Sequence, residues 1–236
     1  MTKVAIITGS SRGIGASCAL EFAKKGYKLA LQGRDTGKLA DIKEKCLKNG
    51  SPGVLTIALD LSETEKLETL IQKTVTEFGR IDVLGLLRNI SERLRSNVFK
   101  QYKVNNAGTM RPGGLEDQTS EDFDFVMAVN CKAPVFLCKA ALPYLKQTKD
   151  RFHGDFYSTC NLTISVQILK KGNIVNISST SSFTPFQGIL SYNMSKAALD
   201  HFTRTMATNL MFEGVKVNSV NPATVRTDIH YSKGKG

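Results

Sequence analysis

The chain has 236 residues, 41% hydrophobic and 22% charged, which is typical of one soluble globular domain with a substantial buried core. Its formal net charge of +11 does not indicate a nucleic-acid partner, because the basic excess is concentrated in residues 85–103 and the last few residues, without interleaved aromatic residues. No run approaches the roughly 18 apolar residues of a membrane span, and the N-terminus does not resemble a signal peptide, so a cytoplasmic protein without a membrane partner is expected. The five cysteines are scattered and lack metal-ligand spacing, so neither disulfides nor a bound metal are expected.

The chain alternates between short apolar runs and stretches with helical periodicity. Strands are expected at residues 4–7, 28–31, 54–57, 81–84, 173–177 and 215–218, and helices at 14–25, 36–48, 63–77, 121–147 and 192–212. This order predicts an α/β fold with a doubly wound, Rossmann-like parallel sheet, whose ligands bind at the carboxyl ends of the strands. No repeat or linker marks a boundary, so residues 1–236 are expected to form a single domain.

A glycine-rich segment follows the first expected strand and opens the first helix. Glycine at such a turn lets backbone N–H groups and a helix N-terminus approach a pyrophosphate. The segment therefore predicts a nucleotide site, against the alternative of a simple tight turn. Its residues that are candidates for cofactor binding are Gly9, Ser11, Arg12, Gly13, Ile14 and Gly15.

The end of the second strand bears on the choice of cofactor. It carries Arg34 where NAD-specific folds place a carboxylate on the ribose 2′-hydroxyl. Arg34 and Arg12 are suited to an adenosine 2′-phosphate, since guanidinium groups pair with phosphate oxygens. NADP(H) is the expected cofactor. Solvent-exposed arginines and an NAD site, favoured by the neighbouring Asp35, are the alternatives.

Tyr192 and Lys196 lie four residues apart near the start of an apolar-periodic helix, so their side chains share one face. A free tyrosine titrates near pH ~10, and a nearby cation stabilises its phenolate. The pair can therefore act together as a proton donor and acceptor. Taken alone, the spacing is more often that of a surface pair.

These motifs resemble those of the short-chain dehydrogenase/reductase family, in its NADP-preferring form. The matching segments are T-G-x-x-x-G-x-G from Thr8, Y-x-x-x-K from Tyr192, Asp60-Leu61, and N-N-A-G at residues 105–108. The resemblance implies four catalytic residues, namely Asn130, Ser179, Tyr192 and Lys196, with Ser178 as the neighbouring alternative to Ser179. It also implies that Asp60 and Leu61 contact the adenine, and that Asn106, Ala107, Gly108, Tyr192, Lys196 and Thr227 contact the cofactor.

The same resemblance implies the reaction. Ser179 would polarise a substrate carbonyl, Lys196 would bind the nicotinamide ribose, and Tyr192 would protonate the developing alkoxide. The expected function is interconversion of a small-molecule ketone or aldehyde and an alcohol, with hydride transfer to or from NADP(H). A noncatalytic NADP(H)-binding protein or an inactive fragment is the alternative. A homo-oligomer is typical of the family.

The sequence departs from the family in three places. Residues 85–103 interrupt the expected fourth strand. A basic segment inside a buried sheet would leave buried charges without partners, which is energetically costly. Residues 150–171 are expected to form a surface loop, where extra length costs little. The family usually continues past Thr227 through a capping helix, another helix and a last strand, so poor solubility is expected. We interpret both segments as retained introns and the end as a truncated gene model; sequencing the transcript tests this.

Overall fold

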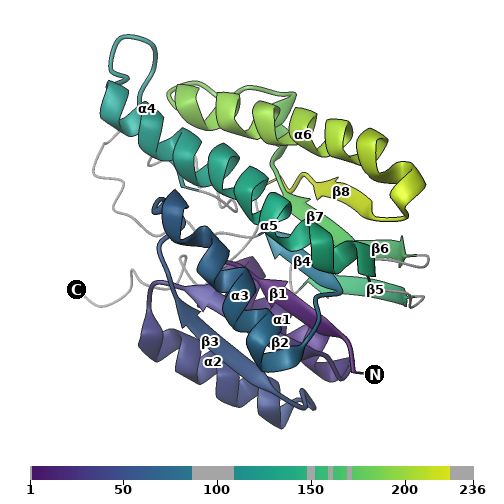
Figure 1. Cartoon of the computed structure of the whole chain (residues 1–236). Helices are drawn as coiled ribbons and strands as arrows, with labels where there is room; N and C mark the ends of the chain where they lie inside the picture. Colours follow the sequence, from purple (N-terminus) through teal and green to yellow (C-terminus); the bar gives the residue numbers. More distant parts are fainter. Residues whose placement is uncertain (1, 87–108, 148–151, 159–161, 169–171, 224–236) are drawn as a thin grey trace.

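The computed structural model describes residues 2–86, 109–147, 152–158, 162–168 and 172–223. Its central feature is a six-stranded sheet in the order β3-β2-β1-β4-β7-β8, in which every neighbouring pair is parallel (Figure 1). β1 and β4 lie at the centre of the sheet. β2 and β3 extend it on one side, and β7 and β8 extend it on the other. The predicted doubly wound, Rossmann-like fold is therefore confirmed.

The strands and helices follow the predicted alternation with shifts of a few residues. The sheet strands are β1 (Val4–Ile7), β2 (Lys28–Gly33), β3 (Val54–Ala58), β4 (Val83–Leu86), β7 (Asn173–Ile177) and β8 (Lys216–Val220). The main helices are α1 (Gly13–Lys24), α2 (Thr36–Lys48), α3 (Leu67–Phe78), α4 (Ser120–Met127), α5 (Ala133–Gln147) and α6 (Leu190–Leu210). α3 ends at Gly79, with φ of 78°, and the 3-10 turn Met211–Glu213 that follows α6 ends at Gly214, with φ of 75°.

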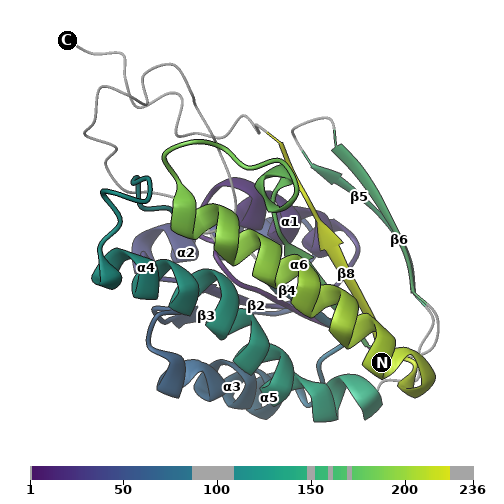
Figure 2. The same cartoon turned by 90° about the horizontal axis from the view of Figure 1, so that it is seen from above.

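Helices cover both faces of the sheet, with α1 and α2 on one side and α3, α5 and α6 on the other (Figure 2). Alternate residues of β1 enter opposite cores. Ile6 packs in the cluster under α3 and α5, whereas Ala5 and Ile7 pack in the cluster under α1 and α2. Burial on both faces explains why the central strands are continuously apolar.

The fourth strand is displaced from its predicted position. The prediction of a strand at residues 81–84, interrupted from residue 85 onward, is wrong in its boundary: β4 runs from Val83 to Leu86. Gly85 pairs with Ile7 and Val175, and Leu86 pairs with Asn176, so the first two residues of the unmatched segment complete the strand. Both are apolar or small, so the strand extends without burying a charge. The remaining residues of that segment lie outside the described residues.

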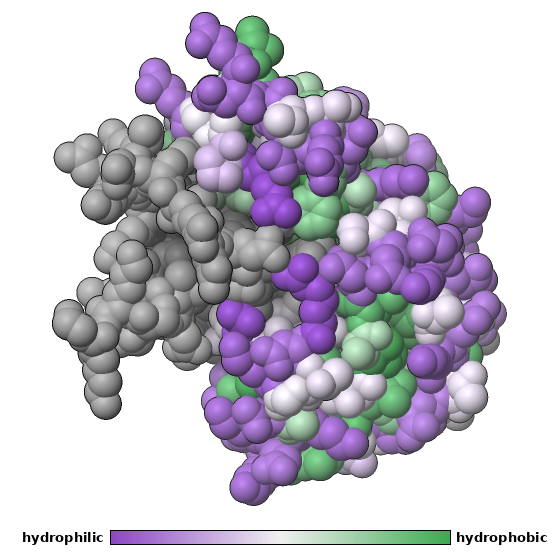
Figure 3. Space-filling view, turned by 90° about the vertical axis from the view of Figure 1, so that its left-hand side faces the viewer, coloured by the Kyte–Doolittle hydropathy of each residue, from purple (hydrophilic) through white to green (hydrophobic). Residues whose placement is uncertain are grey.

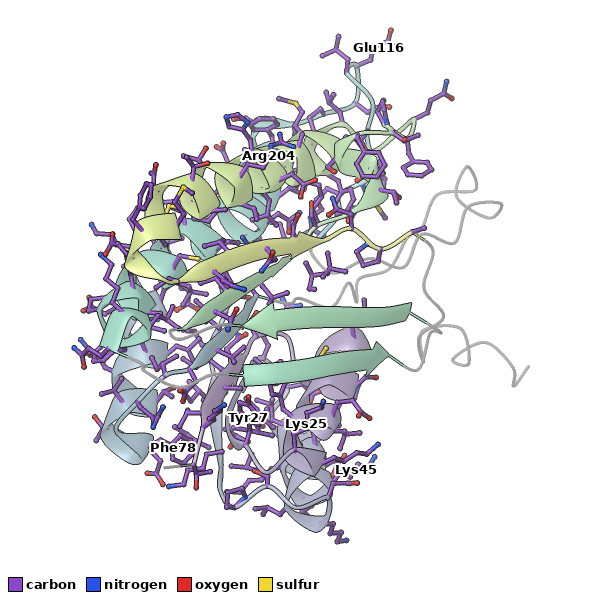
Figure 4. All side chains as sticks on the ribbon, turned by 90° about the vertical axis from the view of Figure 1, so that its right-hand side faces the viewer. Lys25, Tyr27, Lys45, Phe78, Glu116 and Arg204 are labelled. Atoms are coloured by element: carbon purple, nitrogen blue, oxygen red, sulfur yellow. The ribbon has the colours of Figure 1, made fainter. Side chains whose placement is uncertain are left out.

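Residues 152–168 were expected to be part of a surface loop, and this prediction is also wrong. They contain β5 (Phe152–Ser158) and β6 (Leu162–Ile168), which pair antiparallel as a separate two-stranded sheet. β5 lies beside α1 (Figure 4). An assignment based only on the position of this segment between two predicted elements overlooks the two strands.

The expected helix at 121–147 is interrupted. A π-helical turn, Ala128–Lys132, separates α4 from α5 and contains Asn130. The combined helical segment, Ser120–Gln147, is long and apolar enough by length and composition to cross a membrane, but 44% of its apolar window is buried inside the fold, as in a core helix. Its buried face packs against α3 and α6. π turns inside helices often occur at functional sites.

Candidate active site

The glycine-rich loop joins β1 to α1 at the carboxyl edge of the sheet. The N–H of Gly9 donates to Oε1 of buried Gln32 at 3.0 Å, and the N–H of Ser10 donates to the Gln32 carbonyl at 2.9 Å. The amide of Gln32 also donates to the Leu59 carbonyl at 2.5 Å. One side chain of β2 thus connects the loop to the segment after β3. The sequence interpretation overlooked Gln32. A polar residue in an otherwise apolar strand was the signal that could have indicated it.

The N-cap residue of α1, Arg12, makes no side-chain hydrogen bond that caps the helix, and the first turn of α1 contains no acidic residue. Gly15 packs directly on the loop, since a Cβ at this position would lie 2.3 Å from the Gly9 carbonyl oxygen. An uncapped helix N-terminus that the backbone approaches closely is suited to an anion such as a pyrophosphate.

The two arginines expected at the cofactor lie on the surface near this loop. Arg12 is the N-cap residue of α1 and its Nη2 lies 3.8 Å from Oδ2 of Asp35. Nη1 of Arg34 donates to Oδ2 of Asp60 at 3.3 Å. Asp35 caps α2 by accepting from the N–H of Lys38, and this bond is the main reason why its pKa is lowered. Because its carboxylate already caps α2, Asp35 is less suited to contact a ribose hydroxyl.

The remaining predicted contacts to the cofactor are only partly described. Oδ1 of Asp60 accepts from the N–H and hydroxyl of Ser62 at 2.9 and 3.0 Å, so this carboxylate orders the turn after β3. Leu61 is buried beside it. Asn106, Ala107, Gly108 and Thr227 lie outside the described residues. Near the end of the described chain, Ala223 is exposed and follows buried Pro222.

Tyr192 and Lys196 occupy the buried face of α6. Their exposed fractions are 0% and 2%, and Nζ of Lys196 lies 5.7 Å from the centre of the Tyr192 ring. Nζ also donates to the carbonyl of Ile177, the last residue of β7, at 2.8 Å. Met110 and Ile189 pack with the tyrosine ring. The helix therefore delivers both groups to the carboxyl end of a central strand.

Burial shifts the pKa of both groups toward their neutral forms. Desolvation raises the pKa of Tyr192 above its ordinary value, an effect partly opposed by the nearby Ser179 and Ser181 hydroxyls. Neither hydroxyl meets hydrogen-bond geometry with the phenol oxygen, which is buried without a partner among the described residues. Desolvation lowers the pKa of Lys196 to about 7, and the charge of Asp200 opposes this change. A lysine with this pKa is able to change its charge near neutral pH.

The turn after β7 distinguishes the two candidate serines. Oγ of Ser178 donates to the Lys196 carbonyl at 3.2 Å and therefore fastens α6 to the strand. Oγ of Ser179 accepts from the N–H of Ser181 at 3.1 Å, which leaves its own proton available to donate. The Ser181 hydroxyl is also buried, without a partner among the residues described. The geometry favours Ser179 over Ser178 and adds Ser181, which the sequence interpretation overlooked within its serine-rich run.

Asn130 connects three segments through its side-chain amide. Its Oδ1 accepts from the N–H of Thr109, and its Nδ2 donates to the Thr109 carbonyl, both at 2.8 Å. Nδ2 also donates to Oγ of Ser195 at 3.0 Å. Ser195 lies between Tyr192 and Lys196 on α6. The structure therefore places the side chain of Asn130 as a clamp between the chain at Thr109 and the helix that carries the tyrosine.

These residues meet on one side of the molecule. The carboxyl ends of the sheet strands point to the side shown in Figure 3, where hydrophilic residues make up most of the coloured surface. The glycine-rich loop after β1 and the serine turn after β7 both lie at this edge. A doubly wound parallel sheet with this edge defines a Rossmann-like nucleotide-binding protein.

The comparisons with known proteins specify the family. The family model described as short chain dehydrogenase matches residues 3–236. Glucose 1-dehydrogenase of Gluconobacter oxydans is 31% identical over 231 residues, covering 98% of this chain and 72% of that protein. A metagenomic short-chain oxidoreductase solved with NADP superposes with a TM-score of 0.73 at 28% identity, covering 95% of this chain and 83% of the other.

An alcohol dehydrogenase of Thermococcus sibiricus, solved with 5-hydroxy-NADP, has a TM-score of 0.75 and 26% identity, covering 100% of this chain and 83% of the other. The chain belongs to the short-chain dehydrogenase/reductase family. It is thus an oxidoreductase of the family that acts on alcohol or carbonyl groups with a nicotinamide cofactor.

Proposed function

We propose that this chain interconverts a small-molecule ketone or aldehyde and the corresponding alcohol with NADP(H), and that Tyr192 is the general acid and base. The observation that carries the proposal is the buried face of α6. There, Tyr192 and Lys196 lie at the carboxyl end of β7 next to the Ser179 turn. The same carboxyl edge of the sheet carries the N-terminus of α1, which is suited to a pyrophosphate.

The chain's own residues divide the chemistry of the carbonyl oxygen. Ser179 is held as a hydrogen-bond donor because its oxygen accepts from the Ser181 N–H. A donor aimed at the substrate oxygen stabilises the negative charge that develops there. Tyr192 then gives its phenolic proton to that oxygen in the reductive direction and takes it back in the oxidative direction. Lys196 in its charged form lowers the energy of the tyrosinate.

The residues that would hold the cofactor follow from the same edge. The backbone of the glycine-rich loop and α1 would bind the pyrophosphate. Arg12 and Arg34 would face a 2′-phosphate, which would exchange with their partly exposed acidic partners, Asp35 and Asp60. When bound, the nicotinamide supplies or accepts the hydride. The relative solved with NADP supports this cofactor, whereas a fold neighbour at 22% identity was solved with NAD⁺.

A variant at the tyrosine tests the proposed chemistry. Tyr192→Phe removes only the hydroxyl, so we expect NADPH binding, followed by fluorescence, to be retained. Turnover of carbonyl compounds, followed at 340 nm, is expected to fall by about 10² to 10⁴-fold. NADPH binding without any turnover that depends on Tyr192 would instead favour a noncatalytic nucleotide-binding protein or an inactive fragment.

A variant at Arg34 tests the proposed cofactor. Arg34→Ser removes a guanidinium suited to the 2′-phosphate, so NADPH affinity is expected to fall by about 10- to 150-fold, because a charged hydrogen bond contributes about 1.5 to 3 kcal/mol. NADH affinity is expected to change little. Lys43→Ser, a charge change on α2, is the matched control. Equal losses for NADPH and NADH would contradict the proposed role of Arg34.

A further inference from the structure

A third polar residue continues the buried face of α6 that carries Tyr192 and Lys196. Asp200 follows Lys196 by four residues, or about one helical turn, and is 9% exposed. α6 packs against β8 (Figure 1) and also against the serine turn, Thr180–Ser182. Neither the family motifs nor the sequence interpretation assigns this residue a role. A carboxylate buried this far needs partners, since an unpaired charge is costly to bury.

The partners of Asp200 come from two other segments. Its Oδ2 accepts from Oγ of Ser182, in the turn Thr180–Ser182, and from Nδ2 of Asn221 at 2.5 Å. Asn221 follows the end of β8. The remaining carboxylate oxygen, Oδ1, is buried without a hydrogen-bond partner in the described part of the chain. One carboxylate thus joins α6, the serine turn and the end of β8.

The same partners hold the main chain of the proposed catalytic serine. The carbonyl of Ser179 accepts from Nδ2 of Asn221 at 3.2 Å and lies 2.8 Å from Oγ of Ser182, whose single proton is shared between this carbonyl and Asp200. Nδ2 of Asn221 also lies 3.0 Å from Oγ of Ser182. Both donors that reach Asp200 therefore also reach Ser179. Displacement of either one would change the position of the Ser179 backbone relative to Tyr192.

We propose that Asp200 is a positioning residue of the active site, which fixes the Ser179 turn through Ser182 and Asn221 and places a negative charge one helical turn from Lys196. This inference rests on the proposed function. The substrate and cofactor would contact Ser179, Tyr192 and Lys196, and Asp200 would act through them. A carboxylate one helical turn away favours the charged form of Lys196, which is the form that stabilises the Tyr192 tyrosinate.

In the part of the chain that the structure describes, two basic residues of α6 lie one helical turn from Asp200. Lys196 precedes it on α6, and Arg204, labelled in Figure 4, follows it by four residues but is exposed and contacts the His201 ring at 3.5 Å. The groups that reach Asp200 from the serine turn and from the end of β8 are the neutral Ser182 and Asn221. The effect of the Asp200 charge is therefore expected to fall mainly on Lys196, for which Asp200 is the Coulombic influence that raises the pKa.

The kinetic test uses Asp200→Asn, which keeps an acceptor oxygen for Ser182 and Asn221 but removes the charge, and Asn221→Ala, which removes one donor. Both variants are expected to bind NADPH like the parent chain, while kcat falls about tenfold or more, because small displacements of catalytic groups are costly. In Asp200→Asn, the limb where kcat/KM falls with rising pH should move to lower pH, since Lys196 loses its proton earlier. This shift is not expected in Asn221→Ala.

A second measurement does not need turnover. Melting temperatures of the parent chain, Asp200→Asn, Lys196→Met and the double variant form a cycle at pH 6 and at pH 9. At pH 6, Asp200→Asn should lower the Tm by about 3 °C more with Lys196 present than with methionine, a shift on the scale of one charge interaction. At pH 9, where Lys196 is neutral, the difference should vanish.

The outcomes separate the inference from the proposed function. Absence of Tyr192-dependent turnover in the parent chain would remove the proposed function, and the thermal cycle would then decide the inference. Additive effects on Tm at both pH values would overturn it. In an active parent chain, unchanged kcat and an unshifted pH profile in Asp200→Asn would overturn it as well. A pH-dependent coupling, with or without turnover, would support the placement of the Asp200 charge.

Discussion

At the scale of single residues, the loop after β1 depends on the absence of a side chain at Gly15. The structure places the Gly9 carbonyl where a Cβ of residue 15 would lie. Tyr192 depends on the opposite property, because its full burial raises its pKa and makes its ionisation dependent on neighbouring charges. Gly15 thus matters in the proposed nucleotide-binding part of the site because it is small, and Tyr192 matters in the proposed catalytic part because it is buried.

Substitution of Gly15 should weaken both folding and nucleotide binding. In Gly15→Ala, the new methyl group forces the loop and α1 apart, and overpacking of this kind costs about 1 to 3 kcal/mol. We expect a lower Tm and weaker NADPH binding by fluorescence titration. Gly37→Ala is the matched control on α2, since a Cβ at this position would lie 3.7 Å from Oδ1 of Asp35, an ordinary contact distance. Equal behaviour of the two variants would show that the close approach at Gly15 is unimportant.

The adjacent serines should respond differently to the same change. Ser179→Ala removes the proposed donor to the substrate oxygen, so kcat is expected to fall by about 10² to 10³-fold with little loss of stability. Ser178→Ala removes the hydrogen bond to the Lys196 carbonyl and is expected to cost about 1 kcal/mol of stability. Steady-state kinetics and urea unfolding of both variants distinguish the roles. A larger loss of kcat in Ser178→Ala would reverse the assignment.

At the scale of secondary structure, the segment from α4 to α5 shows how one amide shapes a helix. The π turn Ala128–Lys132 directs Asn130 toward Thr109 and Ser195, so the wider turn coincides with a long-range clamp. The displaced β4 shows a different adjustment, in which Gly85 and Leu86 maintain the ladder between β1 and β7. Both adjustments preserve the edge where the site lies.

Loss of the Asn130 clamp should destabilise the fold. Asn130→Ala leaves the backbone groups of Thr109 without their partner, and an unsatisfied buried polar group costs about 1 to 3 kcal/mol. We expect urea unfolding to give a correspondingly lower free energy. Lys132→Ala, an exposed position in the same turn, is expected to change it by less than about 0.5 kcal/mol. A neutral effect of Asn130→Ala would mean that the clamp adds nothing to stability.

At the scale of the whole molecule, the free energy of unfolding should depend on the ionisation of buried groups. Burial lowers the pKa of Lys196 from 10.5 to about 7, whereas it raises the pKa of the Cys46 thiol from 9.0 to about 12. Between pH 7 and about 9, the unfolded chain holds the Lys196 proton that the folded chain has released. Stability should therefore rise over this interval. It should fall at higher pH, because burial also raises the pKa of the Cys138 thiol, and ionisation of both Cys46 and Cys138 in the unfolded chain outweighs the remaining Lys196 contribution.

This pH dependence is checked by urea unfolding from pH 6 to pH 10. The Lys196 contribution between pH 7 and 9 should be about 2 kcal/mol, because one proton changes the unfolding free energy by up to about 1.4 kcal/mol per pH unit. Lys196→Met removes the titrating group and should flatten this rise while the fall at higher pH remains. A rise that persists in Lys196→Met would assign it to the general excess of positive charge.

The sequence by itself determined the alternation of strands and helices, the glycine-rich loop and the Tyr192/Lys196 pair. These features depend on local properties, namely hydrophobic period, backbone freedom and the geometry of one helical turn, which neighbouring residues set. It also gave the expectation that Asn130 and Ser179 belong to the site, although only through resemblance. The structure brings Asn130, Ser179, Tyr192 and Lys196 into one region, and their catalytic roles remain predictions.

Only the tertiary structure decided which residues fill β4, that β5 and β6 pair as antiparallel strands, and how the polar groups around Ser179 pair. Asp200 meets Ser182 and Asn221 from 18 and 21 positions away, and Asn130 meets Ser195 from 65 positions away. The choice of such partners depends on which segments pack together and which buried polar groups each can satisfy. That choice is a property of the whole fold, which no local pattern encodes.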